Sequence, residues 1–203
     1  MSGLQGRKVA ILAAEGVDGG ELDEPRRALE AAEVGAHAVI VSTEPEVIRP
    51  REGDAPVGEI LVGVTVDHAH AADYVALVIP GGAESVRRLG ATARAVQFVR
   101  EFMATDKPVI AVAEGQRLVL AADAVAGRTL AAPTELQGEI RQCGGEIADG
   151  PVHFDERLIT VASRKDLPGA LTRLIQALGT SVDERRVDQL SEQSFPASDP
   201  PQF

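Results

Sequence analysis

The chain has 203 residues, enough for one ordinary domain with a buried core, and 44% of them are hydrophobic, mostly small aliphatic residues. Its formal net charge of −11 at pH 7 would repel phosphate backbones and anionic membrane surfaces, so neither nucleic acid nor a membrane is an expected partner. One cysteine, no apolar signal region and no apolar run of membrane-spanning length predict a cytoplasmic protein without a disulfide or a cysteine-based metal cluster.

Apolar runs alternate with amphipathic segments along most of the chain. The predicted elements are, in order, the strand Val9–Ala14, the helix Glu21–Glu33, the strand His37–Ser42, two hairpin-like pieces near Val47–Arg49 and Glu59–Val66, the strand Tyr74–Ile79, the helix Thr92–Thr105, the strand Pro108–Ala113, the helices Gln116–Ala124 and Thr134–Gln142, the paired strands Val152–Phe154 and Leu158–Ala162, and the helix Leu167–Leu178. Strands that alternate with helices of this length indicate an α/β fold with a mostly parallel sheet covered on both faces.

The composition changes after Gly179. We expect an α/β domain over residues 1–179, followed by a tail over residues 180–203 that is first acidic and then rich in Ser and Pro. The tail has too little apolar surface to fold alone. It is either extended or docked on this subunit or a neighbour through Phe195 and Phe203.

Ligands of parallel α/β sheets bind beyond the carboxyl ends of the strands. The turns Glu15–Gly20, Pro80–Ala83 and Ala113–Gln116 should therefore converge on one site. The last of these follows an apolar strand and precedes a helix, as do turns that hold a reactive side chain above a sheet. Its first residue, Ala113, can neither attack a substrate nor titrate.

Several segments taken together resemble the ThiJ/PfpI superfamily, specifically its branch of PfpI-type intracellular proteases and general stress proteins. The resemblance spans roughly Arg7 to Leu178 and implies a three-layer, flavodoxin-like sandwich similar to class I glutamine amidotransferases. The segments that carry it are Gly16-Val17-Asp18 with Glu24-Pro25-Arg26, Ala72-Asp73-Tyr74 before Leu77-Val78-Ile79-Pro80-Gly81-Gly82, Lys107-Pro108-Val109, Ala126-Gly127-Arg128-Thr129-Leu130, Leu158-Ile159-Thr160, and Ser163-Arg164-Lys165-Asp166-Leu167-Pro168.

The resemblance also implies a site. Members of the superfamily carry a cysteine at the last turn, followed by histidine, glycine and usually proline, and a glutamate of the first turn tunes the cysteine. This chain has Ala113, Glu114 and Gln116 at the cysteine, histidine and proline positions, and Asp18 aligns with the glutamate. Gly115 is retained, as are Gly81 and Gly82, whose backbone N–H groups would form an oxyanion pocket.

Two interpretations of this substituted site remain open. In the first, the site has lost its covalent chemistry, because that chemistry needs a thiolate. In the second, Asp18 and Glu114 form a carboxylate pair, with Glu15 nearby, which supports acid–base catalysis on a small carbonyl compound while Gly81 and Gly82 stabilise an oxyanion. We expect Gly81, Gly82, Gly115 and Glu15 to contact a ligand, and no cofactor or metal.

The remaining polar candidates have simpler explanations. His68 and His70 could bind a metal together with Asp67, but a solvated loop is the favoured explanation. His153 faces either the pocket or a subunit contact, and Cys143 is an ordinary thiol near the end of a helix.

Three functions follow from these interpretations. The first is a stress-related protein without cysteine chemistry that acts by binding a small ligand or by assembling into the homodimer or larger homo-oligomer that the resemblance implies. The second is a lyase, hydratase or hydrolase that uses Glu114 and Asp18. The third is a binding module whose tail, Thr180–Phe203, is the functional part.

Overall fold

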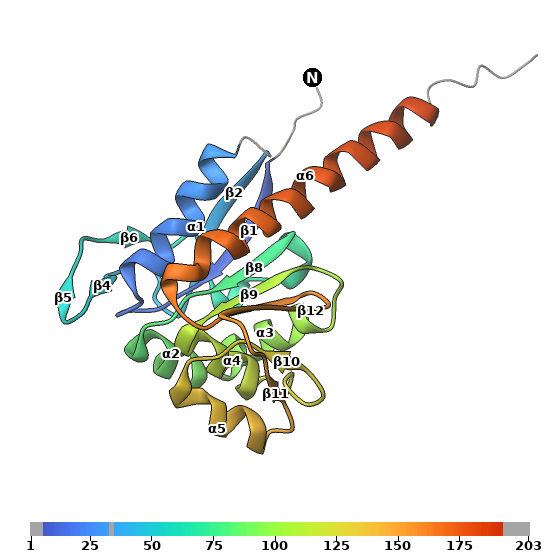
Figure 1. Cartoon of the computed structure of the whole chain (residues 1–203). Coiled ribbons are helices and arrows are strands. Elements are labelled where there is room, and N and C mark those ends of the chain that lie inside the picture. The colour runs from blue at the N-terminus through green and yellow to red at the C-terminus, as the bar shows by residue number, and fades with distance from the viewer. Residues whose placement is uncertain (1–5, 33–34, 193–203) are drawn as a thin grey trace, which may run out of the picture.

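The structure is a computed structural model that describes residues 6–32 and 35–192 (Figure 1). The side chains of residues 180–192 are outside this description. The helices and strands, in chain order, are β1 (Arg7–Leu12), α1 (Gly19–Ala31), β2 (Ala36–Ser42), β3 (Val47–Ile48), β4 (Arg51–Glu52), β5 (Ala55–Pro56), β6 (Ile60–Leu61), β7 (Val64–Thr65), β8 (Ala76–Ile79), α2 (Ala83–Gly90), α3 (Ala93–Met103), β9 (Val109–Val112), α4 (Gln116–Ala121), β10 (Thr129–Leu130), α5 (Thr134–Gln142), β11 (Glu146–Ile147), β12 (Val152–Asp155), β13 (Leu158–Val161) and α6 (Leu167–Glu192).

A seven-stranded sheet in the order β12-β13-β9-β8-β1-β2-β7 forms the middle of the molecule. All neighbouring strands in it run parallel except β12, which pairs with β13 as an antiparallel edge strand. Because β1, β8, β9 and β13 run in the same direction, the turns that follow them lie at one edge of the sheet.

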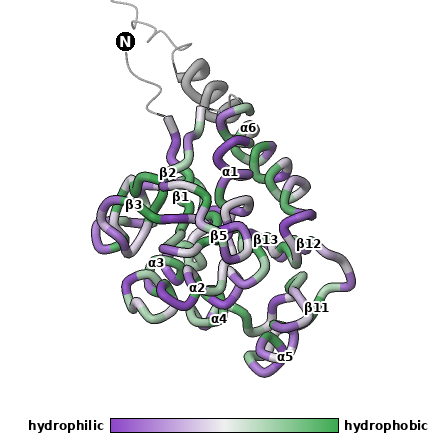
Figure 2. The backbone as a smooth tube through the Cα atoms, turned by 90° about the vertical axis from the view of Figure 1, so that its left-hand side faces the viewer, coloured by the Kyte–Doolittle hydropathy of each residue, from purple (hydrophilic) through white to green (hydrophobic). Residues whose placement is uncertain are grey.

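Helices cover both faces of this sheet, as the alternation of side chains along its strands requires. In β1, Ala10 and Leu12 pack into a core with α2, α3, α4 and α5, whereas Val9 and Ile11 pack into a second core with α1 and α6. The first core contains Phe98 and Phe102, which contact each other edge to face with ring centroids 5.2 Å apart. Figure 2 shows the central strands as hydrophobic and much of the outer chain as hydrophilic.

The predicted fold class is confirmed, because the sheet is mostly parallel and lies between two layers of helices. The helix α2 was not predicted. It buries one side, through Ser85, Val86 and Leu89, but with only eight residues its amphipathic pattern spans little more than two turns and is easily missed. Ser85 also fixes α2 to the end of β1, because its Oγ accepts a hydrogen bond from Ala14 N–H at 2.9 Å.

The predicted end of the last helix at Leu178 needs correction, whereas the domain boundary at Gly179 stays a prediction. The helix α6 continues to Glu192 and extends away from the body of the molecule in Figure 1. Residues 180–192 are therefore helical rather than an extended tail. They contain no proline and several good helix formers, and Gly179 inside a helix costs only about 1 kcal/mol. The expectation for Phe195 and Phe203 concerns residues outside the described part of the chain.

Candidate functional site

The three turns that the sequence predicts to converge do meet, at the carboxyl-terminal edge of the sheet. Asp18 N–H donates a hydrogen bond to Gly81 O at 3.2 Å, which joins the first turn to the second. Gly82 has φ +101°, and a Cβ there would lie 2.6 Å from Asp18 N. A Cβ on Gly115 would overlap Ile79 O and lie 2.8 Å from Pro80 O. Glycine is thus required at Gly82 and Gly115 because backbones approach closely there.

The turn after β9 keeps a strained backbone although it lacks a nucleophile. Ala113 has φ +43°, a left-handed conformation that few residues other than glycine adopt. A single turn of 3-10 helix, Ala113–Gly115, follows and leads into α4. Such strain persists only where the surrounding structure enforces it, and it concentrates at functional sites. The elbow, defined here as Ala113–Gly115, therefore combines a strained backbone with a first side chain that cannot act as a nucleophile.

A buried carboxylate that the sequence did not single out, Glu21, lies beside Glu114. Glu21 is only 4% exposed, and its Oε2 accepts a hydrogen bond from Gly81 N–H at 2.6 Å. A Cβ added at Gly81 would stand 2.6 Å from Glu114 Oε2 and 2.9 Å from Glu21 Oε2, so the two carboxylate oxygens flank the same point. The Gly81 amide assigned to an oxyanion pocket is thus already engaged by a side chain.

Burial raises the pKa of Glu21 to about 7, because little water remains to solvate the charge. The Gly81 N–H opposes this by stabilising the ionised form, whereas the charges of Asp18 and Glu114 raise the pKa further and Arg164 lowers it. Glu21 can therefore hold or release a proton near neutral pH. Its second oxygen, Oε1, accepts no hydrogen bond from any residue in the described ranges.

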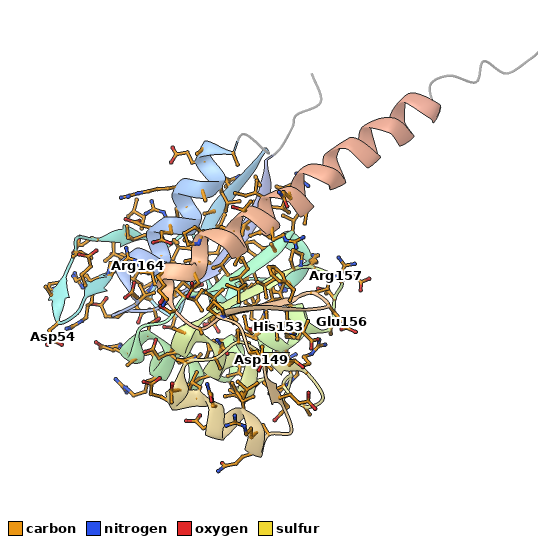
Figure 3. All side chains as sticks on the ribbon, viewed as in Figure 1. Asp54, Asp149, His153, Glu156, Arg157 and Arg164 are labelled. Atoms are coloured by element: carbon orange, nitrogen blue, oxygen red, sulfur yellow. The ribbon has the colours of Figure 1, made fainter. Side chains whose placement is uncertain are left out.

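Asp18 has a structural part at this site. Its Oδ1 accepts the Glu21 N–H at 2.9 Å and so caps the N-terminus of α1. Arg164, which follows β13, lies 4.0 Å from Asp18 Oδ1 and donates from Nε to Glu24 Oε1 at 3.1 Å. A Cβ on Gly20 would overlap the Arg164 guanidinium, so glycine leaves room for it beside α1. Figure 3 shows Arg164 on the side of the molecule opposite Glu156 and Arg157.

Two other residues of the turns form contacts within the protein. Glu15 accepts a hydrogen bond from Arg49 N–H at 3.0 Å, and its other oxygen lies 3.8 Å from the Arg49 guanidinium. Gln116 is fully buried, and its Nε2 donates to Ala131 O at 2.8 Å and to Val161 O at 3.1 Å. Glu15 therefore holds the loop after β3, and Gln116 ties the elbow to neighbouring segments.

A surface cavity of about 450 Å³ lies beside Glu114, between α2 and α4. Val86 and Leu118 form an apolar floor, and Arg87 and Arg117 stand with Glu114 at its rim. This is the space from which a ligand would reach the elbow.

The remaining candidates lie apart from this arrangement. His68 Nδ1 hydrogen-bonds Thr65 Oγ1 at 2.8 Å, and Cys143 is exposed at the end of α5. His153 is half-buried on the edge strand β12, outside the lining of the cavity beside Glu114. Within the described ranges no group of three His, Cys, Asp or Glu side chains is placed to hold a metal ion.

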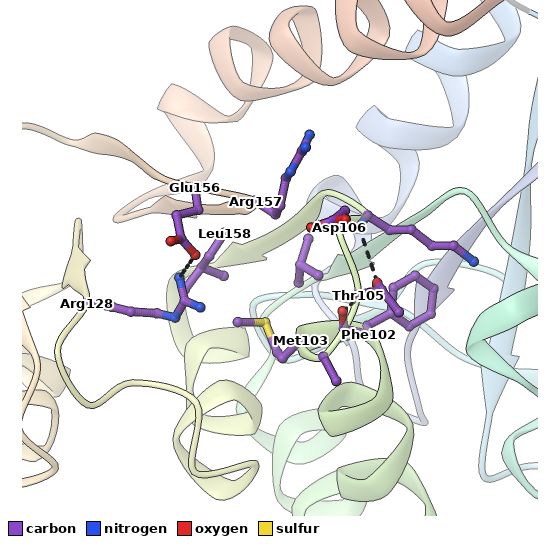
Figure 4. A pocket seen from close by; sticks show the side chains of 11 residues that line it. Phe102, Met103, Thr105, Asp106, Arg128, Glu156, Arg157 and Leu158 are labelled. Carbon is purple, nitrogen blue, oxygen red and sulfur yellow. Dashed lines mark hydrogen bonds and ion pairs between the residues drawn. The ribbon is translucent and has the colours of Figure 1, made fainter. Parts of the chain in front are cut away.

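A second cavity, of about 420 Å³, lies at the opposite, amino-terminal edge of the sheet (Figure 4). Three of its charged side chains, Arg128, Glu156 and Lys107, already have partners within the protein. Arg128 contacts Asp155 at 2.9 Å and Glu156 at 3.1 Å, and Lys107 Nζ donates to Ala71 O at 2.8 Å. Burial lowers the pKa of Lys107, but its Nζ is already held by the carbonyls of Ala71 and Ala72, so this cavity is a weaker candidate for chemistry than the elbow.

Sequence reasoning missed Glu21, which opens the predicted helix Glu21–Glu33 and was not among the candidate residues. A signal was present. Glu21 lies four residues before Pro25 and eight before Leu29, so it falls on the same side of α1 as these buried residues. A carboxylate at the start of the buried stripe of a helix, next to the carboxyl ends of the strands, should point into the site.

Comparison with known proteins gives a consistent result. The sequence pattern of the DJ-1/PfpI family matches residues 7–177. General stress protein 18 of Bacillus subtilis (strain 168) is 30% identical over 165 residues, which are 80% of this chain and 92% of that protein. Protein/nucleic acid deglycase 2 of Escherichia coli (strain K12) is 28% identical over 175 residues, 85% of this chain and 98% of that protein.

A solved structure is also similar. It is a two-domain protein of Anabaena variabilis with DJ-1/ThiJ/PfpI-like and ferritin-like domains, which aligns with a TM-score of 0.77 and 26% identity over 85% of this chain. The alignment spans about half, 48%, of that longer protein. In the described part of the present chain, no helix is both long enough and apolar enough to span a membrane.

Proposed function

The chain belongs to the DJ-1/PfpI family, and on this basis we propose that it is a stress-related member whose elbow binds a small ligand reversibly, without cysteine chemistry. The single observation that carries this proposal is the pairing at the elbow. Ala113 supplies no nucleophile, and Glu21 accepts the Gly81 N–H at 2.6 Å while its other oxygen has no hydrogen-bond partner among the described residues.

Covalent catalysis in this fold requires a thiolate or hydroxyl at the strained turn. The methyl group of Ala113 cannot form a bond to a carbonyl carbon, and Cys143 stands on the exposed end of α5 rather than at the rim of the cavity beside Glu114. Reversible binding needs only complementary polar groups and a cavity, and both are present. The stress-related context rests on the name of the similar Bacillus protein. A cytoplasmic location and assembly into a homo-oligomer belong to the same proposal.

The test compares wild-type protein with Ala113→Cys/Glu114→His, which restores the cysteine and histidine of the family. Turnover of methylglyoxal and of a peptide substrate is measured for both, with Ala113→Ser as a control that adds a hydroxyl but no thiolate. We expect activity at the buffer background for wild type and for Ala113→Ser, and a gain for the double variant. Wild-type turnover within about tenfold of the double variant would contradict the proposal, since one tenfold step is only about 1.4 kcal/mol of barrier.

A second function is favoured by the pKa of Glu21. A buried carboxyl with a pKa of about 7 next to a second carboxylate is suited to general acid–base catalysis, because it can donate and regain a proton at neutral pH. The reaction would be proton transfer on a small carbonyl compound, as in a lyase or hydratase. Loss of turnover in both Glu21→Gln and Glu114→Gln, with folding intact, would support this function over binding alone.

A further inference from the structure

The cavity beside Glu114 carries opposite charges at two places on its rim. Arg87 projects from α2, Glu114 belongs to the elbow, and the buried side chains of Val86 and Leu118 form the floor between them. Its volume of about 450 Å³ exceeds that of a small organic molecule of four or five carbon atoms. The arrangement is amphiphilic and dipolar rather than uniformly charged.

Arg87 is the free cation of this rim. Its guanidinium makes no hydrogen bond and no ion pair with any residue of the described ranges. Its neighbour Arg88 differs, because it contacts Glu84 at 2.9 Å and Glu44 at 3.6 Å. Arg117, the other rim cation, contacts Glu139 at 2.8 Å. A ligand anion would therefore find its strongest unsatisfied partner at Arg87.

The elbow end of the cavity is negative. Glu114 is exposed, and Glu21 lies behind it, nine-tenths buried and with Oε1 unpartnered within the described residues. Asp18 adds a third carboxylate close enough to influence Glu21. Arg164 offsets only part of this charge: it lies 4.0 Å from Asp18 Oδ1 and 3.1 Å from Glu24 Oε1, and its effect on the pKa of Glu21 is smaller than those of Asp18 and Glu114. A cationic nitrogen placed here would relieve the repulsion among these carboxylates and donate hydrogen bonds to them.

We propose that this cavity binds a small zwitterion, with its ammonium group on Glu114 and its carboxylate on Arg87. The alkyl part of the ligand covers Val86 and Leu118. This inference rests on the proposed function, because it assumes reversible binding at the elbow, and it adds the chemical class of the ligand.

The experiment uses four compounds of equal carbon number, titrated into the full chain at pH 7 by isothermal calorimetry. They are 2-aminobutyrate and 4-aminobutyrate, which carry both charges at short and long separation, and butyrate and butylamine, which carry one charge each. We expect at least one zwitterion to bind about tenfold more tightly than both singly charged compounds, because each desolvated charge pair contributes separately.

Single-residue variants test which end of the cavity binds the ammonium group and which binds the carboxylate of the ligand. Arg87→Ala should weaken binding of the zwitterion about tenfold and leave the affinity for butylamine unchanged. Glu114→Gln should also weaken binding of the zwitterion about tenfold, but leave the affinity for butyrate unchanged. Arg88→Ala is the matched control, since Arg88 lies next to Arg87 on α2 but contacts Glu84 and Glu44, and it should leave binding unchanged.

Two results would overturn the inference. Equal affinities for the zwitterions and butylamine, still lowered by Glu114→Gln, would leave reversible binding at the elbow intact but remove the role of Arg87. No binding of any of the four compounds would also overturn it. The proposed loss of cysteine chemistry is judged separately, by the turnover of the cysteine-restored variant.

Discussion

The two edges of the central sheet hold buried carboxylates in different ways. At the carboxyl-terminal edge, Glu21 is 4% exposed and accepts only the Gly81 N–H, and its pKa rises to about 7. At the amino-terminal edge, Asp155 receives the Arg128 guanidinium at 2.9 Å and Thr129 N–H at 2.8 Å. Burial without a bonded cation makes a carboxyl hold its proton, whereas burial with one makes it a structural anchor.

The residues with a positive φ at the two edges also differ in their structural setting. Glu156 has φ +51° in the tight turn between β12 and β13, where a left-handed conformation matches the twist of the paired strands. Ala113 has φ +43° between a strand and a helix, where no hairpin requires it. The strain at Ala113 coincides with the carboxylates of the elbow, and that coincidence makes this edge the stronger candidate for a functional site.

The largest expected effect is the pH dependence that Glu21 imposes on stability. The folded chain holds this proton up to a pKa of about 7, whereas an exposed glutamate loses it near 4.5, so the folded state binds more protons in this window. The free energy of unfolding should therefore fall as the pH rises from 4.5 to 7, by roughly 3 kcal/mol from this group. Glu21→Gln, which stays neutral, should remove that fall, as measured by urea unfolding across the window.

Glu30→Gln is the matched control for this prediction. Glu30 lies exposed on the same helix, so its variant should keep the wild-type pH profile. An identical slope in wild type and Glu21→Gln would show that Glu21 is ionised in the folded state, and the contrast between the two edges would disappear.

The next effect concerns the close backbone contact that supports the elbow. Gly115→Ala should cost about 2–3 kcal/mol, because its Cβ would overlap Ile79 O and lie 2.8 Å from Pro80 O, neither of which can rotate away. Gly138→Ala on α5 is the control, since nothing lies within 4 Å of its added Cβ, and it should stabilise by about 0.5–1 kcal/mol. Thermal unfolding measures both. A cost under about 1 kcal/mol for Gly115→Ala would mean that the elbow is loosely packed.

The fold was largely predictable because its signals are local. Buried parallel strands such as β1 and β9 are continuous apolar runs, and α5 has the predicted bounds, Thr134–Gln142. The short α2 and the two-residue strands β10 and β11 give no such run, because each is too short to show a continuous apolar stretch or a clear period. The continuation of α6 to Glu192 was missed because composition suggested a tail.

The site was predictable in place but not in detail. The convergence of the three turns follows from parallel topology, which a sequence pattern reveals. The choice between Asp18 and Glu21 depends on the rotation of α1 about its axis, and the two differ by less than one helical turn. The occupied Gly81 amide and the free Arg87 depend on side-chain positions, which no periodicity encodes.

The smallest effects on stability are expected at the amino-terminal edge, where the two carboxylates that contact Arg128 should contribute unequally to the free energy of unfolding. Asp155→Asn should cost about 1 kcal/mol, because its side chain is only 20% exposed and loses a charged hydrogen bond. Glu156→Gln should change stability by less than about 0.5 kcal/mol, because its side chain is 76% exposed and water replaces the lost contact. Chemical unfolding at pH 7 measures the difference, and neither variant should alter the pH slope set by Glu21. Equal costs at the two positions would show that Arg128 holds both anions as one buried unit.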